Sequence, residues 1–420
     1  MNKVKLGELL TIKHGYAFKS ECYVDKSEYA LVTLANISSR NDFQFDKSKT
    51  TYYGGTFSDE FILHEGDLIL PLTEQVIGLF GNSAFVPSVS GHTFVLNQRV
   101  GKVIVKEDKA DKYYIHYLLS TKSVREQLEH RASGTKQRNI SPDDVYDVVV
   151  YVPDISAQQR IGKTLYGLEK KVKLNNLIND NLWQTISTIY DYWFTQFDFP
   201  DVNGKPYYTA GGEMVWNDKI KRAIPSGWTV ASIINNPLTQ VIKPGVDAFT
   251  TKEYLATADV IGTSIASGSI IDYENREGRA NMQPTINSVW FAKMKNSIKH
   301  LFLNKEMAPI IDSAILSTGF CGLKCAEKSF EYVSSFISNP RFEIVKDILA
   351  HGATQEAVNN DDMESIAFII PSDEILEQYH AVTKDMFAQI SQNICENREL
   401  IKVRDWLLPM LMNGQATIAD

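Results

Sequence analysis

Two segments of the chain combine an apolar run, a proline and a long helical pattern. Apolar residues fill positions 148–152 and 366–370, and Pro153 and Pro371 follow these runs directly. Short apolar runs of this kind predict buried strands, and proline cannot continue a hydrogen-bonded ladder. After each proline, apolar residues recur at alternating steps of four and three, which is the spacing of one helix face. Each segment therefore predicts a buried strand followed by a long amphipathic helix.

The two helical patterns run for about 35 residues each, longer than most helices of globular domains. A capping box over 156–159 predicts the start of the first helix, and Asn413-Gly414 predicts the end of the second. We expect the two helices to pair with each other, antiparallel, because each follows its own domain. Separate docking of each helix and pairing between two chains are the alternatives. The expected contact positions, here called the seam, are Leu165, Leu168, Val172, Asn175, Asn179 and Leu182 in the first helix and Met386, Ile390, Asn393, Asn397 and Leu400 in the second.

Asparagines interrupt the apolar seam at matching places in both helices. Asn175 and Asn179 recur 218 residues later as Asn393 and Asn397. Buried asparagines at such positions cost stability but can fix the register of a helix pair. Our hypothesis is that the pair acts as a ruler between two domains.

The same interval of 218 residues relates further segments. The sequence Gly-x-x-Gln occurs at 134–137 and at 352–355, and an aspartate pair occurs at 143–144 and at 361–362. Looser similarity links 34–37 with 257–260, 68–72 with 289–293, and 95–97 with 315–317. A repeat of this length indicates two copies of one scaffold. We therefore predict an α+β protein with two similar, strand-rich globular domains separated by two long antiparallel, coiled-coil-like helices, related by a pseudo-twofold repeat.

The predicted domain boundaries follow from these patterns and from a turn-rich connection after the first helix. The expected segments are a first globular domain over 1–153, the first long helix over 154–197, a linker over 198–223, a second globular domain over 224–371, and the second helix with a C-terminal tail over 372–420.

Composition narrows the class of protein. The chain has 420 residues, 44% hydrophobic and 22% charged, which is typical of folded soluble proteins. The N-terminus lacks a signal-peptide pattern, and no apolar run approaches a membrane span, so we expect a cytoplasmic protein without a membrane partner. The net charge of −8 counts against a general nucleic-acid coat protein but leaves room for a local basic groove. The four cysteines, Cys22, Cys321, Cys325 and Cys395, form no disulfide framework or paired zinc motif, and we expect reduced thiols.

Motifs of catalytic chemistry are not found. The sequence has no phosphate-binding P-loop, no nucleophile elbow and no His-Glu-x-x-His zinc motif. The aspartate pairs at 143–144 and 361–362 could bind a metal, as in a nuclease, but their position before a strand favours helix-start capping. We therefore predict a binding protein with no catalytic and no metal site, and keep a metal-dependent nuclease as an alternative.

Several segments, in this order, resemble the specificity subunits of type I restriction-modification systems. They are Lys5–Leu9 and Gly15–Ser20, Gly66–Leu70, Leu96–Val100, the helix from Gln158 to Phe194, Ile224–Trp228, and Glu396–Gly414. The segment Leu238–Gly245 departs from the family pattern, because it lacks the Gly-x-Ala-Phe of the first domain.

The resemblance implies a DNA-binding role. Each globular domain would be a target recognition domain for one half of a split site in double-stranded DNA, and the helices would be spacers that set the gap. Two methyltransferase subunits would methylate adenine at N6 with S-adenosylmethionine, and translocase-nuclease subunits would use ATP and magnesium. This chain would hold no cofactor itself.

Side chains with forked donors and acceptors suit base recognition, while lysine, serine and threonine can hold phosphates. The Gly-x-x-Gln repeat is the leading candidate, although a turn required by the fold would also recur. The predicted DNA contacts lie in polar stretches beside the strand runs: Lys19, Gln75, Asn97, Gln98, Arg99, Thr135, Lys136, Gln137 and Arg138 in the first domain, and Asn287, Ser317, Thr318, Lys324, Thr354 and Gln355 in the second.

Two further interpretations stay open at this point. The helices could recruit partners in a scaffold whose globular domains bind protein, which uniformly acidic faces would favour. Within the family, the chain could serve a methylation-only defence system.

Overall fold

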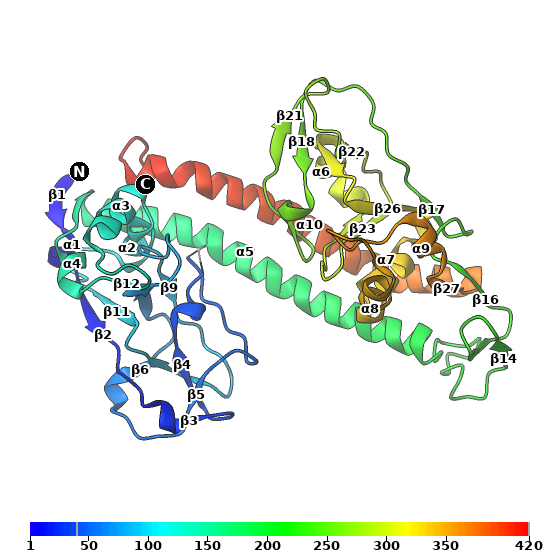
Figure 1. Cartoon of the computed structure of the whole chain (residues 1–420), viewed down its shortest axis with the longest axis horizontal. Coiled ribbons are helices and arrows are strands. Elements are labelled where there is room, and N and C mark those ends of the chain that lie inside the picture. The colour runs from blue at the N-terminus through cyan, green and yellow to red at the C-terminus, as the bar shows by residue number, and fades with distance from the viewer. Residues whose placement is uncertain (39–40, 419–420) are drawn as a thin grey trace. The chain divides into compact units, whose positions relative to one another are not determined.

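The computed structural model describes residues 1–38 and 41–418, so positions 39–40 and 419–420 of the predicted first domain and C-terminal tail lie outside the described residues. The chain has a mixed α/β fold with several small sheets and two long helices (Figure 1). It forms two compact units: unit 1 comprises 1–170 and 401–420, and unit 2 comprises 171–400. Each has its own hydrophobic core. Among the described residues, no helix has both the length and the apolar character that a membrane crossing requires.

The central sheet of unit 1 is antiparallel, and its two faces pack on different layers. Its order is β2 (Leu10–His14), β11 (Val100–Val105), β7 (Leu68–Pro71) and β9 (Ala84–Phe85). Because side chains alternate along a strand, Leu68 and Leu70 join the core under α2 (Lys112–Leu119) and α3 (Lys122–Arg131). Ile69 joins a second core on the other side. That side is covered by a sheet of the order β3 (Tyr23–Val24), β5 (Tyr52–Tyr53), β4 (Tyr29–Val32), β10 (Thr93–Leu96) and β6 (Ile62–Leu63).

Short elements complete unit 1. The apolar run at 148–152 forms β13 (Val149–Val152), which pairs antiparallel with β1 (Asn2–Lys5) and ends before Pro153. The other elements are α1 (Leu6–Leu9), the paired strands β8 (Thr73–Glu74) and β12 (Arg138–Asn139), and α4 (Pro142–Tyr146).

Unit 2 repeats this architecture, which confirms the prediction of two related strand-rich domains. Its antiparallel sheet has the order β17 (Thr239–Val241), β26 (Phe320–Cys325), β23 (Ser288–Ala292) and β24 (His300–Leu303). The covering sheet has the order β21 (Ser269–Ile271), β18 (Lys252–Leu255), β25 (Ala314–Ser317) and β22 (Ala280–Met282). The parallel pair β18–β25 matches the parallel pair β4–β10 of unit 1.

The helices of unit 2 follow in the same order as those of unit 1. They are α7 (Phe330–Ser338), α8 (Pro340–Leu349) and α9 (Asn360–Glu364), after which β27 (Ala367–Ile370) pairs with β16 (Thr229–Ser232). Unit 2 also has α6 (Ala308–Ser313) and the hairpin of β19 (Val260–Ile261) and β20 (Ser264–Ile265).

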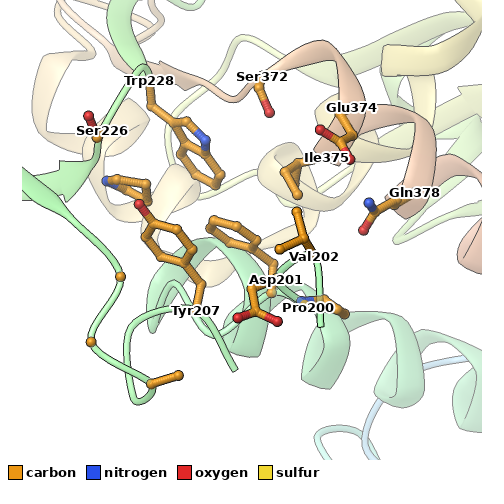
Figure 2. A pocket seen from close by; sticks show the side chains of 15 residues that line it. Pro200, Asp201, Val202, Tyr207, Ser226, Trp228, Ser372, Glu374, Ile375 and Gln378 are labelled. Carbon is orange, nitrogen blue, oxygen red and sulfur yellow. The ribbon is translucent and has the colours of Figure 1, made fainter. Parts of the chain in front are cut away.

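The connection that follows the first long helix is organised by stacked aromatic rings. Phe199 stacks on Tyr207 and on Trp228, with ring centroids 4.6 and 5.0 Å apart. A hairpin of β14 (Met214–Asn217) and β15 (Arg222–Pro225) lies between these residues in the sequence. A pocket of about 460 Å³ opens between this connection and the start of the second long helix, with Trp228, Tyr207 and Ile375 in its wall (Figure 2).

The two predicted long helices are α5 (Ile155–Tyr190, 36 residues) and α10 (Asp373–Met412, 40 residues). The predicted capping box over 156–159 is wrong, because the carboxylate of Asp154 accepts the Ala157 N–H at 2.8 Å and α5 already begins at Ile155. A π-helical turn, Asp191–Thr195, follows α5. Gly414 ends α10 in the left-handed region, at φ 71°, as Asn413-Gly414 predicted.

Within unit 2, α5 and α10 pair antiparallel through the predicted asparagines. Asn175 Nδ2 donates to Asn397 Oδ1 at 2.9 Å, and Asn393 Nδ2 donates to Asn179 Oδ1 at 2.8 Å. Further along the pair, Trp183 of α5 packs on Phe387 of α10, each next to a predicted seam position, Leu182 or Met386. In unit 1, residues of both helices enter one core, Leu165 from α5 and Leu411 from α10. The seam is therefore a contact within one chain.

Candidate nucleic-acid interface

In unit 1, the predicted contacts gather where several strands end at one edge of the central sheet. The Gln98 N–H bonds the carbonyl of Tyr16 at 2.9 Å, which joins the β10–β11 turn to the loop after β2. The Leu72 N–H bonds the carbonyl of Arg99 at 2.9 Å, which joins that turn to the end of β7. The pairing of β8 with β12 adds the segment 133–139. This edge, made of 15–19, 72–79, 97–99 and 133–139, is here called the loop edge of unit 1.

Most predicted side chains of the loop edge are available to a ligand. Six of them are exposed, and Arg99 is half-buried; the exposed ones are Lys19, Gln75, Gln98, Thr135, Lys136 and Gln137. Lys19 lies 3.8 Å from Glu21, an exposed ion pair that solvent screens. Amides and lysines concentrated on one set of loops provide donors and acceptors for bases and phosphates.

Two predicted contacts of unit 1 are already occupied within the fold. Asn97 is buried, and its side-chain oxygen accepts the Arg99 N–H at 3.3 Å, so it shapes the β10–β11 turn. The guanidinium of Arg138 binds the buried carboxylate of Glu74, with Nε 2.7 Å from Oε1. Glu74 neutralises this guanidinium, so Arg138 joins two loops and is a poor candidate for a free base contact. This pairing could not be predicted from local sequence, because Glu74 and Arg138 lie in distant segments.

The Gly-x-x-Gln repeat forms the same tight turn in both units. Gly134 and Gly352 have φ values of 105° and 141°, a region that favours glycine. A Cβ at either position would collide with the carbonyl oxygen three residues on, that of Gln137 or Gln355. Bridges between residues 133 and 139 and between 351 and 357 close the two turns. The fold alone explains why the glycine recurs, and the exposed residues that follow it differ between the units.

In unit 2, four predicted contacts lie at the matching edge. Ser317 and Thr318 form the β25–β26 turn, where the Lys293 N–H bonds the carbonyl of Gly319 at 3.0 Å. The Val358 N–H bonds the carbonyl of Lys293 at 3.0 Å, which brings in the turn that carries Thr354 and Gln355. Ser317 itself is buried, and its hydroxyl accepts the Gly319 N–H. The loop edge of unit 2 comprises 242–245, 279, 293–299, 317–319 and 351–357.

Asn287 and Lys324 lie at the opposite end of the sheet. Their predicted grouping with the four contacts of the loop edge is therefore wrong. Ser288 pairs with Lys324, whereas Ala292 at the other end of β23 pairs with Phe320 beside the loop edge. The ammonium group of Lys324 donates to the carbonyl of Ile286, and the carbonyl of Asn287 accepts the Cys325 N–H at 2.8 Å. Both residues therefore close the end of the sheet remote from the other predicted contacts.

Three basic residues at the loop edge of unit 2 were missed. Lys243 lies two residues after the end of β17. The Ile242 N–H before it bonds the carbonyl of Gly322, which holds this segment beside β26. The carbonyl of Arg279 accepts the Thr318 N–H at 2.9 Å, and Lys293 is joined to Gly319 as described above. Lys243 and Arg279 are exposed. Lys243 stands in the segment that departs from the family pattern, which left no signal to find it.

The second aspartate of each pair caps a helix, as predicted for these pairs. Asp144 accepts the Ser141 N–H at 2.8 Å while the Ser141 hydroxyl accepts the Asp144 N–H at 3.2 Å, a capping box at the start of α4. Asn359 and Asp362 form the same reciprocal pair at the start of α9. Hydrogen bonds to the backbone thus account for the second carboxylate of each pair, that of Asp144 and that of Asp362.

Other candidate chemistry lies away from the loop edges. Burial raises the pKa of Cys321 to about 12 and raises that of Cys325 as well, so both are neutral thiols inside β26. Over residues 1–38 and 41–418, no three histidine, cysteine, aspartate or glutamate side chains come together as metal ligands would. The pocket in Figure 2 is lined by none of the predicted DNA contacts.

The chain is similar in sequence to one family of known proteins. Residues 1–184 match the model of the type I restriction modification DNA specificity domain. The chain is 22% identical over 342 residues to the type I restriction enzyme MjaIX specificity subunit of Methanocaldococcus jannaschii, covering 79% of this chain and 75% of that protein. It is 24% identical over 335 residues to the HindI specificity subunit of Haemophilus influenzae, covering 67% and 72%.

A solved structure shares the fold. The crystal structure of the type I restriction-modification S subunit from M. genitalium superposes with a TM-score of 0.53 at 12% identity, covering 98% of this chain and 96% of that one. This likeness extends over both units.

Proposed function

We propose that this chain is a type I restriction-modification specificity subunit and that it recognises a DNA site in two halves, one half with each unit. The observation that carries the proposal is the repeated loop edge. Both units present corresponding loops on the same sheet scaffold, but with different exposed side chains, such as Lys136 in unit 1 and Thr354 in unit 2. A shared scaffold with different polar loops is what two modules with different base preferences require.

The chemistry of the complex would lie in partner subunits. We propose that methyltransferase subunits, two of them, transfer a methyl group from S-adenosylmethionine to adenine N6, and that translocase-nuclease subunits use ATP and magnesium for cleavage. In that arrangement this chain contributes sequence recognition and holds no cofactor. A methylation-only system would use the chain in the same way.

The test is to co-express the full chain with the methyltransferase encoded beside it and to map N6-methyladenine across the host genome. We expect a split motif, two short defined halves around an unspecified gap. Lys136→Ala with Gln137→Ala should weaken methylation through one half, and Thr354→Ala with Gln355→Ala through the other. An active methyltransferase that gives no new motif with this chain would contradict the proposal.

A further inference from the structure

The loop after β7 in unit 1 displays large aliphatic side chains at its tip. Val76 is 79% exposed and Ile77 is 77% exposed, directly after the exposed Gln75. Exposure alone does not indicate a binding site, because single apolar residues are common on protein surfaces. These side chains lie within the loop edge of unit 1, beside the predicted contact Gln75.

Unit 2 displays an isoleucine at the corresponding position. The Lys295 N–H bonds the carbonyl of Glu356 at 3.0 Å, which matches the pairing of Glu74 with Arg138 in unit 1. Ile77 is the third residue after Glu74, and Ile298, which is 62% exposed, is the third residue after Lys295. The two loops otherwise share no sequence, since the residues before these isoleucines are Gln75-Val76 and Asn296-Ser297.

A buried charge holds the loop of unit 1 in shape. The carboxylate of Glu74, only 1% exposed, accepts the N–H groups of Leu79 and Phe80 at 2.9 and 3.2 Å. Its other oxygen binds Arg138, as described above. One carboxylate thus fixes the chain on the far side of Ile77 and ties the loop to the Gly-x-x-Gln turn.

A buried charge of opposite sign holds the loop of unit 2. The ammonium group of Lys346, with no exposed surface, donates to the carbonyls of Ala292, Met294 and Ser297 at 3.2–3.3 Å. Glu343 neutralises it at 2.6 Å and also bonds His300. Burial acts to raise the pKa of Glu343, but the bonds from His300 and Lys346 outweigh it and lower the pKa, so the carboxylate stays ionised.

Both loops therefore carry an exposed isoleucine at a tip that a buried charge holds in place, beside polar candidate contacts. The charge is a carboxylate in unit 1 and an ammonium group in unit 2. Burying an apolar side chain on binding is favourable, and the apolar group that DNA offers beside its hydrogen-bonding edges is the thymine C5-methyl group in the major groove. We propose that Ile77 and Ile298 each contact a thymine methyl group in the half-site of their own unit. This inference rests on the proposed function and adds specificity-determining residues to it.

The experiment measures binding of the full chain, in complex with its methyltransferase, to duplexes that contain the mapped motif. Deoxyuridine replaces each thymine of a half-site in turn, which removes the C5-methyl group and leaves the hydrogen-bonding edge intact. A half-site that holds a methylated adenine contains at least one thymine, because thymine is the base paired with it. We expect the wild-type complex to lose about fourfold in affinity at one or more positions, the value of one buried methyl group.

Ile77→Ala should lose affinity for the thymine duplex and show no further loss with deoxyuridine at that position, in one half-site only. Ile298→Ala should do the same in the other half-site. Ile286→Ala is the matched control, because Ile286 is 45% exposed and directly precedes Asn287, at the end of the unit 2 sheet remote from the loop edge, and it should behave as wild type.

The inference is overturned if Ile77→Ala and Ile298→Ala leave affinity unchanged, or lower it equally for thymine and deoxyuridine duplexes at every position. Failure of the proposed function looks different, because the wild-type chain would then direct no split motif at all.

Discussion

At the scale of single residues, the ion pairs that join equivalent loops differ sharply in burial. Arg138 binds the buried Glu74 in unit 1, and at the corresponding position Glu356 binds Lys295 at 2.8 Å with both side chains substantially exposed. Removing one member of a buried pair leaves an uncompensated charge, whereas exposed pairs contribute little.

Arg138→Ala should therefore lower the free energy of unfolding by about 3–5 kcal/mol, while Glu356→Ala should cost less than about 1 kcal/mol. Urea unfolding, with hydrogen exchange over 72–80 to localise the effect, measures the difference. If Arg138→Ala instead weakened DNA binding with stability intact, Arg138 would be a free DNA contact, as its sequence context predicted.

The roles that depend on near neighbours in the sequence were the part of the site that the sequence predicted best. Helix capping by Asp144 and Asp362 follows from near neighbours, and so does the turn at Gly134. The misplacement of Asn287 and Lys324 has a different origin. Whether a polar residue lies at one end of a strand or the other depends on strand direction and pairing, which local sequence does not contain.

At the scale of elements, the asparagine layer of the helix pair offers a test of register. Asn393 Nδ2 donates to Asn179 Oδ1, and both side chains are buried. Asn393→Leu alone leaves that oxygen without its donor and should lower stability by about 1–3 kcal/mol. Replacing both asparagines by leucine should recover most of this loss, because an apolar layer needs no donor. Thermal unfolding of the two single variants and the double variant measures the coupling, and additive losses would contradict it.

The asparagine positions of the seam were the element-scale feature that the sequence predicted best. A period of alternating three and four residues fixes which side chains share a face, and the repeated asparagines identify their partners. The hydrogen bonds of Asn175 and Asn179 to α10 confirm that choice. The sheets were predicted only as strand runs, since the order β17-β26-β23-β24 depends on contacts between distant segments.

At the scale of the whole molecule, the long helices are the elements that belong to both units. α5 passes from unit 1 to unit 2 after Lys170, and α10 returns to unit 1 after Leu400. If the chain recognises a split site, the length of this helix pair should set the gap between the halves. Two recognition modules on one face of DNA favour half-sites about one helical turn apart.

Deleting seven residues from each helix removes two turns and keeps the period of the seam, so the pair can still form. At 1.5 Å per residue the pair shortens by about 10 Å, or roughly three base pairs at 3.4 Å each. We expect the mapped methylation motif to keep both half-sites and to lose about three base pairs from its gap. Deletion from α5 alone is the control, because it breaks the seam and should abolish methylation. An unchanged gap in the paired deletion would show that the spacing is set elsewhere, by the partner subunits or by the DNA itself.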